Sequence, residues 1–342
     1  MRKLAAAMAF AITVAACGGG GTTAPAASAA GSAAASAKVT KDVTYRIGHT
    51  AANSSILELD SLDFIKKITD ASGGKLTGKS YPAGQLGKQQ EMVEQVQVGS
   101  LELVVTSSEF VSVVPEFGIF DLPFAFRDRA EIKKAVEGPL GDELRKIAAT
   151  KGLVILGFWE NGFRHITNNK RPIKVPDDLK GLKMRTPPNP DRVKMFNLWG
   201  ANAAPLDFAE LFSALQTGVF DGQENPLQNV TSSKFYEVQK YLSMSGHVYT
   251  PTYLVASKNW FEGLEPAAQQ MMRDLAVANG DASRERGKKF DDDGIKIVKD
   301  KGMQVNEDVD KTAFAKAGQP LYDDYQKKYP ALLDLYHKSV GR

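Results

Sequence analysis

Cysteine and histidine are scarce in this sequence of 342 residues, which contains one cysteine, Cys17, and four histidines. A single thiol cannot form an internal disulfide, so the fold has to be stable without one. The histidines show none of the paired spacings of zinc sites, and the sequence has no H-E-x-x-H or G-x-S-x-G motif. The acidic run at residues 291–293 lacks the alternating ligand spacing of a calcium loop. We therefore predict a protein that is not an enzyme and that holds neither a metal nor a cofactor.

A strong excess of charge of one sign is also absent. The 43 Lys and Arg residues and 40 Asp and Glu residues give a formal net charge of +3, so electrostatics give no reason to expect nucleic acid as a partner. Hydrophobic residues make up 43% of the chain and charged residues 24%, which is typical of a soluble globular protein. The length is sufficient for two domains. After residue 17, no stretch reaches the roughly 18 uninterrupted apolar residues that cross a bilayer.

The N-terminus has the pattern of an export signal. Arg2 and Lys3 precede an apolar stretch at residues 4–16, which is too short to span a bilayer as a helix. The stretch ends in V-A-A-C, which resembles the lipobox of bacterial lipoproteins, with Cys17 at the position where a lipid is attached. We predict that residues 1–17 are a lipoprotein signal peptide. The alternative is a simple secretory signal in which the cysteine is incidental.

Residues 18–38 are of low complexity and have no apolar side chain larger than alanine or proline. Such a segment cannot bury a core, and we predict that it is a flexible tether. The folded part then begins near Val39. We expect it in the periplasm or at the outer face of the cytoplasmic membrane, anchored by the N-terminal lipid.

Strand and helix patterns alternate along the rest of the chain. Apolar residues at three- and four-residue spacings predict a helix from Ile56 to Ile68, and a second helix is predicted from Phe208 to Thr217 with Asp207 as its N-cap. Residues 265–301 predict one long helix. The predicted strands are 43–49, 75–82, 101–105, 152–160, 181–187, 201–206, 219–224 and 247–257. This alternation favours α/β layers with a mainly parallel sheet.

A phosphate-binding motif occurs at residues 73–80, where G-G-K-L-T-G-K-S satisfies G-x-x-x-x-G-K-[ST]. Phosphate binding by this motif requires a strand before the loop and a helix after it, so that helix N–H groups face the phosphates. Here a predicted helix precedes the motif and Tyr81-Pro82 follows it. We therefore interpret the glycines as the end of a helix, followed by a strand.

Polar side chains follow several predicted strands, among them Arg164, Arg185 and Asn225. Ligands of open α/β sheets bind beyond the carboxyl ends of the strands. Two arginines leaving neighbouring strands could grip a carboxylate with a bidentate geometry that lysine cannot match, and Asn225 could add an amide donor. The alternative is that each arginine forms a structural or surface ion pair, although no acidic residue lies within three positions of Arg164.

Four segments are similar to the solute-binding proteins of tripartite ATP-independent periplasmic (TRAP) transporters, the DctP-type family. The resemblance extends from about residue 43 to residue 336, and the order and spacing of the last three segments are specific. The segments are Y-P-A-G-Q-L-G, N-G-F-R-H-I-T-N-N-K-R-P-I-K-V-P-D-D-L-K-G-L-K-M-R-T-P, L-F-S-A-L-Q-T-G-V-F-D-G-Q-E-N-P and K-F-Y-E-V-Q-K-Y-L-S-M-S-G-H.

The resemblance implies a two-lobed, periplasmic-binding-protein-like α/β fold with a hinge and a long helix bridging both lobes. Lobe I would comprise residues 39–162 and about 251–290, and lobe II residues 163–250 and about 291–342. The implied function is to capture an organic acid in the cleft between the lobes and deliver it to integral-membrane permease subunits. We expect a monomer.

The same resemblance assigns roles to individual residues. The arginine of the family's N-G-x-R segment, which forms the principal salt bridge to the ligand carboxylate, corresponds to Arg164. The arginine of G-L-K-x-R corresponds to Arg185, and the asparagine of G-Q-E-N-P to Asn225. Phe208 falls where the family places an aromatic ring against the ligand. A desolvated arginine–carboxylate contact is strong only where water is excluded, which closure of the lobes would achieve.

Ligand identity is less well defined by the sequence. Thr50, Asn53 and Gln89 are candidates from the first lobe for contacts to the distal end of the ligand. Sialic-acid-binding members have an acidic residue that aligns with about Ser107, where this sequence offers a hydroxyl group instead. That difference argues for a smaller organic acid, either a C4-dicarboxylate or a sugar acid.

Two other functions are compatible with the same residues. A sensory binding subunit would use the same capture of an organic acid to signal to a receptor or kinase. A secreted enzyme acting on carboxylates is the second alternative. It would convert the ligand, whereas a binding protein returns it unchanged.

Overall fold

The computed structural model of the protein describes residues 38–342. The predicted signal peptide with Cys17, and the predicted tether except for its last residue, lie outside this part of the chain. Among the helices of residues 38–342, none combines the length and the apolar character that a membrane crossing requires.

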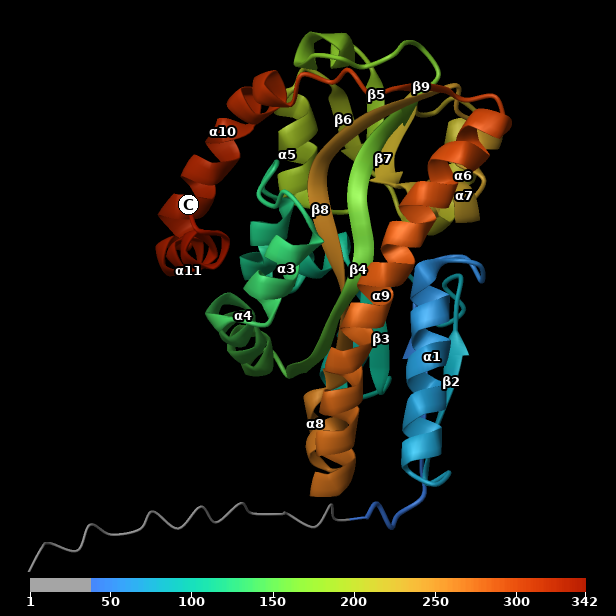
Figure 1. Ribbon diagram of the computed structural model, residues 1–342, viewed down its shortest axis with the longest axis vertical. Coiled ribbons are helices and arrows are strands. Elements are labelled where there is room, and N and C mark those ends of the chain that lie inside the picture. The colour runs from blue at the N-terminus through green and yellow to red at the C-terminus, as the bar shows by residue number, and fades with distance from the viewer. Residues whose placement is uncertain (1–37) are drawn as a thin grey trace, which may run out of the picture. The chain divides into compact units, whose positions relative to one another are not determined.

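Two long strands form the middle of the sheet and pair with strands in both of its halves. β4 (Leu153–Asn168) and β8 (Tyr241–Ser257) pair with each other in antiparallel orientation along most of their length. β3 (Leu103–Thr106) pairs with the C-terminal part of β8, whereas β7 (Gly222–Pro226) pairs with the C-terminal part of β4. As Figure 1 shows, β4 and β8 thereby run from one group of strands into the other.

The strands form a single sheet in the order β2-β1-β3-β8-β4-β7-β5-β6, with β9 paired to β8. The predicted mainly parallel sheet is wrong in its centre, because the β3–β8, β8–β4 and β4–β7 pairs are antiparallel. The pairs on both flanks are parallel. The remaining strands are β1 (Val43–Gly48), β2 (Leu76–Tyr81), β5 (Lys183–Thr186), β6 (Asn202–Pro205) and β9 (Gln304–Asn306).

Helices cover the sheet and close its ends. The α-helices are α1 (Ile56–Ala71), α2 (Gln89–Val98), α3 (Arg129–Val136), α4 (Pro139–Thr150), α5 (Pro190–Leu198), α6 (Leu211–Gln216), α7 (Leu227–Ser232), α8 (Lys258–Glu262), α9 (Pro266–Asp300), α10 (Lys311–Lys328) and α11 (Pro330–Val340). Short 3-10 helices connect them: η1 (Ser108–Ser112), η2 (Pro115–Asp121), η3 (Pro176–Leu179), η4 (Phe208–Glu210) and η5 (Phe235–Glu237).

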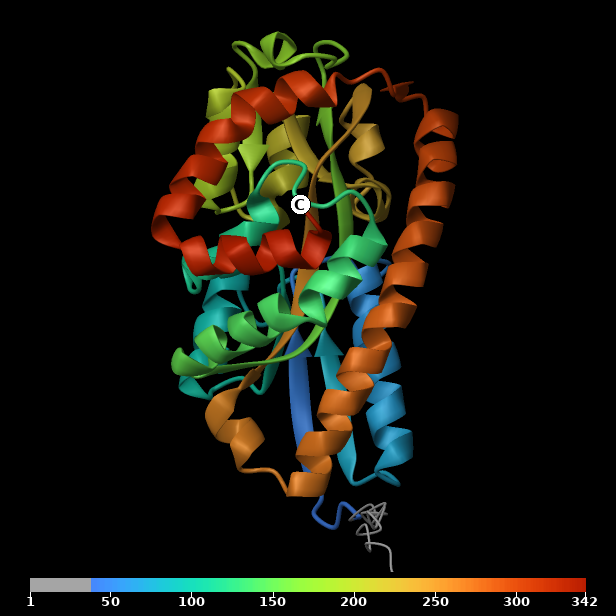
Figure 2. The ribbon, with the colours of Figure 1, turned by 60° about the vertical axis from the view of Figure 1, so that its left-hand side comes forward.

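The long helix α9 links both groups of strands. It packs on β4 and contacts α1 towards one end and α7 towards the other (Figure 2). The approach to β4 is close because α9 has glycines where it meets the strand: a Cβ at Gly280 would lie 2.8 Å from the carbonyl oxygen of Phe158, and one at Gly287 would lie 2.3 Å from Cγ of Glu160. Trp159 Nε1 donates to the carbonyl of Ala276 at 2.8 Å, which adds a hydrogen bond to this contact.

The core is divided by the sheet because successive strand side chains point to opposite faces. In β3, Leu103 and Val105 pack in the cluster that includes Phe64 of α1, whereas Val104 joins the cluster on the other face. A third cluster surrounds α6 and α7. The result is a sheet covered on both faces.

The C-terminal helices return towards the middle of the molecule. α11 packs against α3 and α4, and the Tyr336 hydroxyl donates to the carbonyl of Ala125 at 2.5 Å. The predicted residue limits of the two lobes stay a prediction.

Most predicted elements are present near their predicted positions, including the long helix. The interpretation of residues 73–80 is confirmed, since α1 ends before Gly73 and Gly74, which have positive φ, and β2 follows. Two predictions are wrong in detail. The helix predicted from Phe208 begins as the 3-10 turn η4, and the Asp207 side chain does not cap it but pairs with Lys88 Nζ at 2.5 Å.

The second correction concerns Arg164, Arg185 and Asn225, which were expected to follow strands. Arg185 lies within β5 and Asn225 within β7, and Arg164 lies within β4, because that strand continues to Asn168. Gly162, with φ of 121°, accompanies a register shift against β8. The irregularity does not end the strand, since β7 pairs with it from Arg164 onwards.

Candidate functional site

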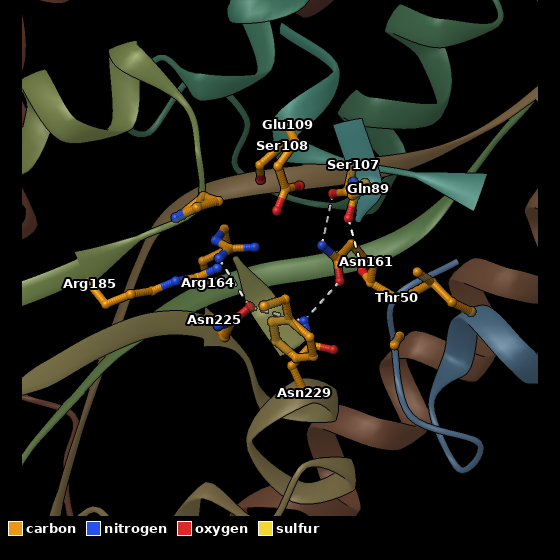
Figure 3. A pocket seen from close by; sticks show the side chains of 14 residues that line it. Thr50, Gln89, Ser107, Ser108, Glu109, Asn161, Arg164, Arg185, Asn225 and Asn229 are labelled. Carbon is orange, nitrogen blue, oxygen red and sulfur yellow. Dashed lines mark hydrogen bonds between the residues drawn. The ribbon is translucent and has the colours of Figure 1, made fainter. Parts of the chain in front are cut away.

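A small cavity lies beside the central strands and is lined by seven of the eight predicted ligand-binding residues (Figure 3). Most of its lining groups are polar, and the apolar ones include Leu57 and the Phe208 ring. The lining residues are Thr50, Ala51, Leu57, Gln89, Ser107, Ser108, Glu109, Asn161, Arg164, Arg185, Pro187, Phe208, Asn225 and Asn229.

Arg164 is fixed by one edge of its guanidinium group. Nε donates to Oε2 of Glu224 at 2.5 Å, and Nη2 donates to Oε1 and to the backbone carbonyl of Glu224 at 2.9 and 2.7 Å. Nη2 also donates to Oδ1 of Asn225 at 3.1 Å. The arginine is 3% exposed. The ion pair that the sequence left open as an alternative is therefore present, and its acidic partner lies on the neighbouring strand β7.

Glu224 is the centre of a fully buried charged cluster. Its carboxylate accepts hydrogen bonds from Arg164, from Nη1 of Arg192 at 2.7 Å and from Nε2 of His247 at 3.1 Å. Burial alone would raise the pKa of Glu224, but the charges of Arg164 and Arg192 outweigh it and hold the pKa well below its usual range. Arg192 also pairs with Asp121 of η2. The carboxylate is thus ionised and holds Arg164 in one orientation.

Arg185 of β5 is held differently, by a neutral partner. Its Nε and Nη2 donate to the backbone carbonyl of Leu206 at 2.8 and 2.5 Å, and its guanidinium carbon lies 6.0 Å from the centre of the Phe208 ring. Burial lowers the pKa of Arg185 to about 10, with Glu109 and Glu224 acting in the opposite direction. The side chain therefore stays charged at neutral pH without an ion pair to either carboxylate.

Both guanidinium groups keep donors for a further partner. Within residues 38–342, no hydrogen bond occupies Nη1 of Arg164 or of Arg185. Both residues line the same cavity. Two fixed cations with unused N–H groups in a buried space form a site whose chemistry suits an anion, above all a carboxylate.

The side of the cavity opposite the arginines is formed by hydroxyl and amide groups of Thr50, which follows β1, of Gln89 in α2 and of Ser107, which follows β3. Thr50 donates to Oε1 of Gln89 at 3.1 Å, and Nε2 of Gln89 donates to the hydroxyl of Thr106 at 2.9 Å. Ser107 donates to the carbonyl of Pro251 at 3.1 Å. Asn53, the eighth predicted residue, is exposed and does not line the cavity, because it lies in the turn before α1.

A network of amide side chains joins the two sides of the cavity. Asn161 of β4 donates to the hydroxyl of Ser107 at 2.9 Å and accepts from Gln228 Nε2 at 2.9 Å. Asn229 of α7 donates to Oδ1 of Asn225 at 3.0 Å. These contacts fix the orientation of each amide. A polar site with fixed donors and acceptors can bind ligands selectively by the positions of their hydroxyl groups.

Seven lining residues were not predicted, and three of them, Asn161, Asn229 and Glu109, carried a signal in the sequence. Asn161 begins the N-G-F-R segment that ends in Arg164, and Asn229 lies four residues after Asn225. Glu109 is a charged residue between a buried strand and the fully buried Phe110, which is an unusual position for a carboxylate. Residues 38–342 contain no group of three or more His, Cys, Asp or Glu residues arranged to hold a metal ion.

Comparison with known proteins assigns the chain to a family. The bacterial extracellular solute-binding protein family 7 (DctP) matches residues 47–328. The 2,3-diketo-L-gulonate-binding periplasmic protein YiaO of Escherichia coli (strain K12) is 36% identical over 295 residues, which cover 85% of this chain and 89% of the relative.

Solved structures of TRAP periplasmic solute-binding proteins share the fold. A protein from Polaromonas sp. JS666 bound to D-erythronate is 37% identical, with a TM-score of 0.83 and coverage of 86% of this chain and 98% of that one. The sugar acid binding protein of Advenella mimigardefordensis with galactonate is 34% identical (TM-score 0.83, coverage 87% and 99%). A protein from Sulfurospirillum deleyianum with succinate is 29% identical (TM-score 0.81, coverage 88% and 99%).

The chain therefore belongs to the DctP family of TRAP solute-binding proteins. The family inferred from sequence resemblance and the two-lobed α/β fold class are both confirmed. Members of this family are periplasmic proteins that bind organic acids such as sugar acids and dicarboxylates and work with membrane permease components. They are transport proteins and not enzymes, which points to a non-enzymatic function here.

Proposed function

We propose that this protein captures a small organic acid by its carboxylate, which Arg164 and Arg185 hold in the cavity, and delivers it to the permease of a TRAP transporter. The observation that carries the proposal is the pair of buried guanidinium groups with unused Nη1 donors in one cavity. Asn225 and Phe208 complete this end of the site, and Thr50, Gln89 and Ser107 contact the distal end of the ligand.

The arrangement favours binding because little has to be ordered when the ligand arrives. Glu224 and Asn225 hold Arg164, and the Leu206 carbonyl holds Arg185. Preorganised groups lose less conformational entropy on binding, and charge-assisted hydrogen bonds are about twice as strong as neutral ones.

The ligands of related proteins indicate the class of acid that this protein binds. The related structures contain D-erythronate, galactonate and succinate, and the related E. coli protein is named for 2,3-diketo-L-gulonate. All are carboxylates, and most carry several hydroxyl groups. We infer a sugar acid or a C4-dicarboxylate for this protein too.

The cellular arrangement that we propose has three further parts. Cys17 carries a lipid that anchors the protein at the membrane, and residues 18–38 act as the tether. The protein acts as a monomer. Closure of two lobes, with the limits predicted from the sequence, excludes water from the ligand.

Calorimetry with arginine variants tests the proposal. Arg164→Lys and Arg185→Lys keep the positive charge but lose the planar fork, so each should weaken binding of the captured acid by about 100-fold. Arg171→Lys is the matched control, because Arg171 lies outside the cavity and donates to the exposed backbone carbonyls of Asp178 and Lys180. Unchanged affinity in both cavity variants would contradict the proposal. If Arg164→Lys fails to fold, Arg185→Lys still tests the proposal, because Arg185 forms no ion pair within residues 38–342 whose loss would unfold the protein.

A further inference from the structure

Glu109 places a carboxylate in the cavity together with the two arginines. It belongs to η1, directly after the buried strand β3, and is 7% exposed. Figure 3 shows its side chain directed towards Arg164 and Arg185. The residue lines the cavity, so a bound ligand meets this carboxylate as well as the guanidinium groups.

The carboxylate of Glu109 has no fixed partner. Apart from its own backbone N–H, no hydrogen bond or salt bridge joins it to another residue of the part of the chain that the structure describes. Burial raises the pKa of Glu109, and the charges of Arg185 and Arg164 offset only part of this effect, while Asp207 adds to it. Buried carboxylates are normally paired. An unpaired one that faces a cavity is available to a ligand.

With Glu109 ionised, the buried charges around the cavity balance before any ligand binds. The buried charged side chains here are three arginines and three carboxylates: Arg164, Arg185, Arg192, Glu109, Glu224 and Asp121. Outside this buried set, Lys88 pairs with both Asp207 and Glu210. One ligand carboxylate therefore adds one negative charge to a neutral site, and a second would add another in a region of low dielectric constant.

We propose that Glu109 makes the cavity selective for hydroxy monocarboxylates over dicarboxylates, with ligand hydroxyl groups donating to its carboxylate. The inference rests on the proposed function, because it assumes that the arginines hold the ligand's first carboxylate. A hydroxyl group satisfies Glu109, whereas a second carboxylate can only accept hydrogen bonds and repels it. The hydroxyl and amide groups of Thr50, Gln89 and Asn161 extend the same preference along the cavity.

Two matched ligand pairs test this selectivity by calorimetry on the full-length protein. Galactonate and galactarate differ only by oxidation of the terminal carbon to a second carboxylate, and D-erythronate and meso-tartrate differ in the same way. Wild-type protein should bind the monocarboxylate of a pair about 100-fold more tightly, the size of an electrostatic perturbation of two pKa units. Equal affinity for the dicarboxylate in both pairs overturns the inference.

The variant Glu109→Gln assigns the selectivity to this residue. It removes the charge and keeps the shape, so the ratio of affinities within each pair should fall by at least about tenfold. An unchanged ratio in a folded variant overturns the inference, and if the variant fails to fold, the wild-type ratios alone decide it.

Arg164→Lys separates this result from the proposed function. It should weaken both members of a pair and leave their ratio close to that of the wild type. A large effect of Arg164→Lys together with equal wild-type binding of both members retains the proposed function and overturns only the selectivity. Wild-type protein that binds no carboxylate overturns both.

Discussion

Arg164 combines two roles that the sequence presented as alternatives. Its Nε–Nη2 edge is paired with Glu224 inside the protein, and Nη1 faces a cavity. An arginine can do both because its five N–H donors lie in a rigid plane, so one edge can be fixed while the other stays free. Lysine has a single ammonium group and could not separate the two roles in this way.

Replacing Glu224 should reveal the structural role. Glu224→Gln leaves the buried charges of Arg164 and Arg192 without their shared counter-ion, and breaking a buried pair typically costs about 3–5 kcal/mol of unfolding free energy. Urea denaturation measures the loss. The control Glu237→Gln alters an exposed carboxyl and should stay within about 0.5 kcal/mol of wild type. A similar stability for both variants would mean that the cluster does not need its central anion.

The pH dependence of Glu224 has a definite sign. Because its pKa lies below the usual range in the folded protein, its contribution to stability is complete above the pKa of the unfolded chain and is lost as the pH falls. Acid unfolding of the wild type should therefore be steeper than that of Glu224→Gln.

At the scale of elements, β4 determines where the site lies. Its N-terminal part packs under α9, and its C-terminal part brings Arg164 opposite Pro226 of β7. Residues that point to the other face of the same strand serve stability. His165 accepts a hydrogen bond from the backbone N–H of Gly246 through Nδ1 at 3.1 Å.

His165 should make stability depend on pH in a measurable way. Burial, together with the charges of His247, Lys311 and Arg164, lowers the pKa of His165 from 6.5 to about 3. The unfolded chain takes up this proton below pH 6.5 and the folded protein does not, so the stabilising effect is complete above pH 6.5 and falls with pH. His165→Asn keeps an acceptor near Nδ1. Between pH 7 and 5 it should lose about 2 kcal/mol less unfolding free energy than the wild type. Equal losses in urea titrations at the two pH values would contradict the buried, neutral histidine.

The contact between α9 and β4 predicts an unusual response to alanine. In an exposed helix, Gly→Ala stabilises by up to about 1 kcal/mol. At Gly280 the added Cβ meets the carbonyl oxygen of Phe158, a backbone atom that cannot move aside, so Gly280→Ala should destabilise by about 1–3 kcal/mol. Val277→Ala on the exposed face of the same helix should change little. A thermal melt that shows Gly280→Ala to be stabilised would mean that helix and strand can separate at little cost.

The elements that the sequence predicted well are those with a strong local pattern. The spacing of apolar residues predicted α1 and α9 to within a few residues of their ends, and Gly73 and Gly74 correctly predicted where α1 ends. The antiparallel pairs in the centre of the sheet were not predicted, because a strand that is buried on both faces shows a continuous apolar run and no alternation, a pattern typical of parallel sheets. The continuation of β4 through Gly162 was missed, since a glycine weakens a strand pattern and here marks a bulge instead of the strand end.

The sequence likewise predicted some residues of the site and missed others. Arg164, Arg185 and Asn225 lie in segments with a specific family pattern, and all three line the cavity. Glu109 lines the cavity but was not predicted, whereas Asn53 was predicted but does not line it. Which of two nearby polar residues faces a cavity depends on loop conformation, and no periodicity determines that conformation.

At the scale of the whole molecule, the long strands β4 and β8 and the helix α9 connect both groups of strands and leave the cavity between them. A ligand that contacts both groups should stabilise the folded protein as a unit. At one hundred times its Kd, it adds about 2.7 kcal/mol. In a protein of this size that corresponds to a rise in Tm of about 5 °C or more.

A thermal-shift screen of organic acids measures this rise. Hydroxy monocarboxylates should give the largest shifts, and the same acids at the same concentrations should shift Arg164→Lys much less. Equal shifts in wild type and variant would place the ligand outside the cavity.

The most direct test of the account is a crystal structure of the protein with its acid bound. The ligand carboxylate should lie within hydrogen-bond distance of Nη1 of both Arg164 and Arg185, while the Arg164–Glu224 pair stays intact. A carboxylate located elsewhere, with both Nη1 groups still unoccupied, would contradict the central claim.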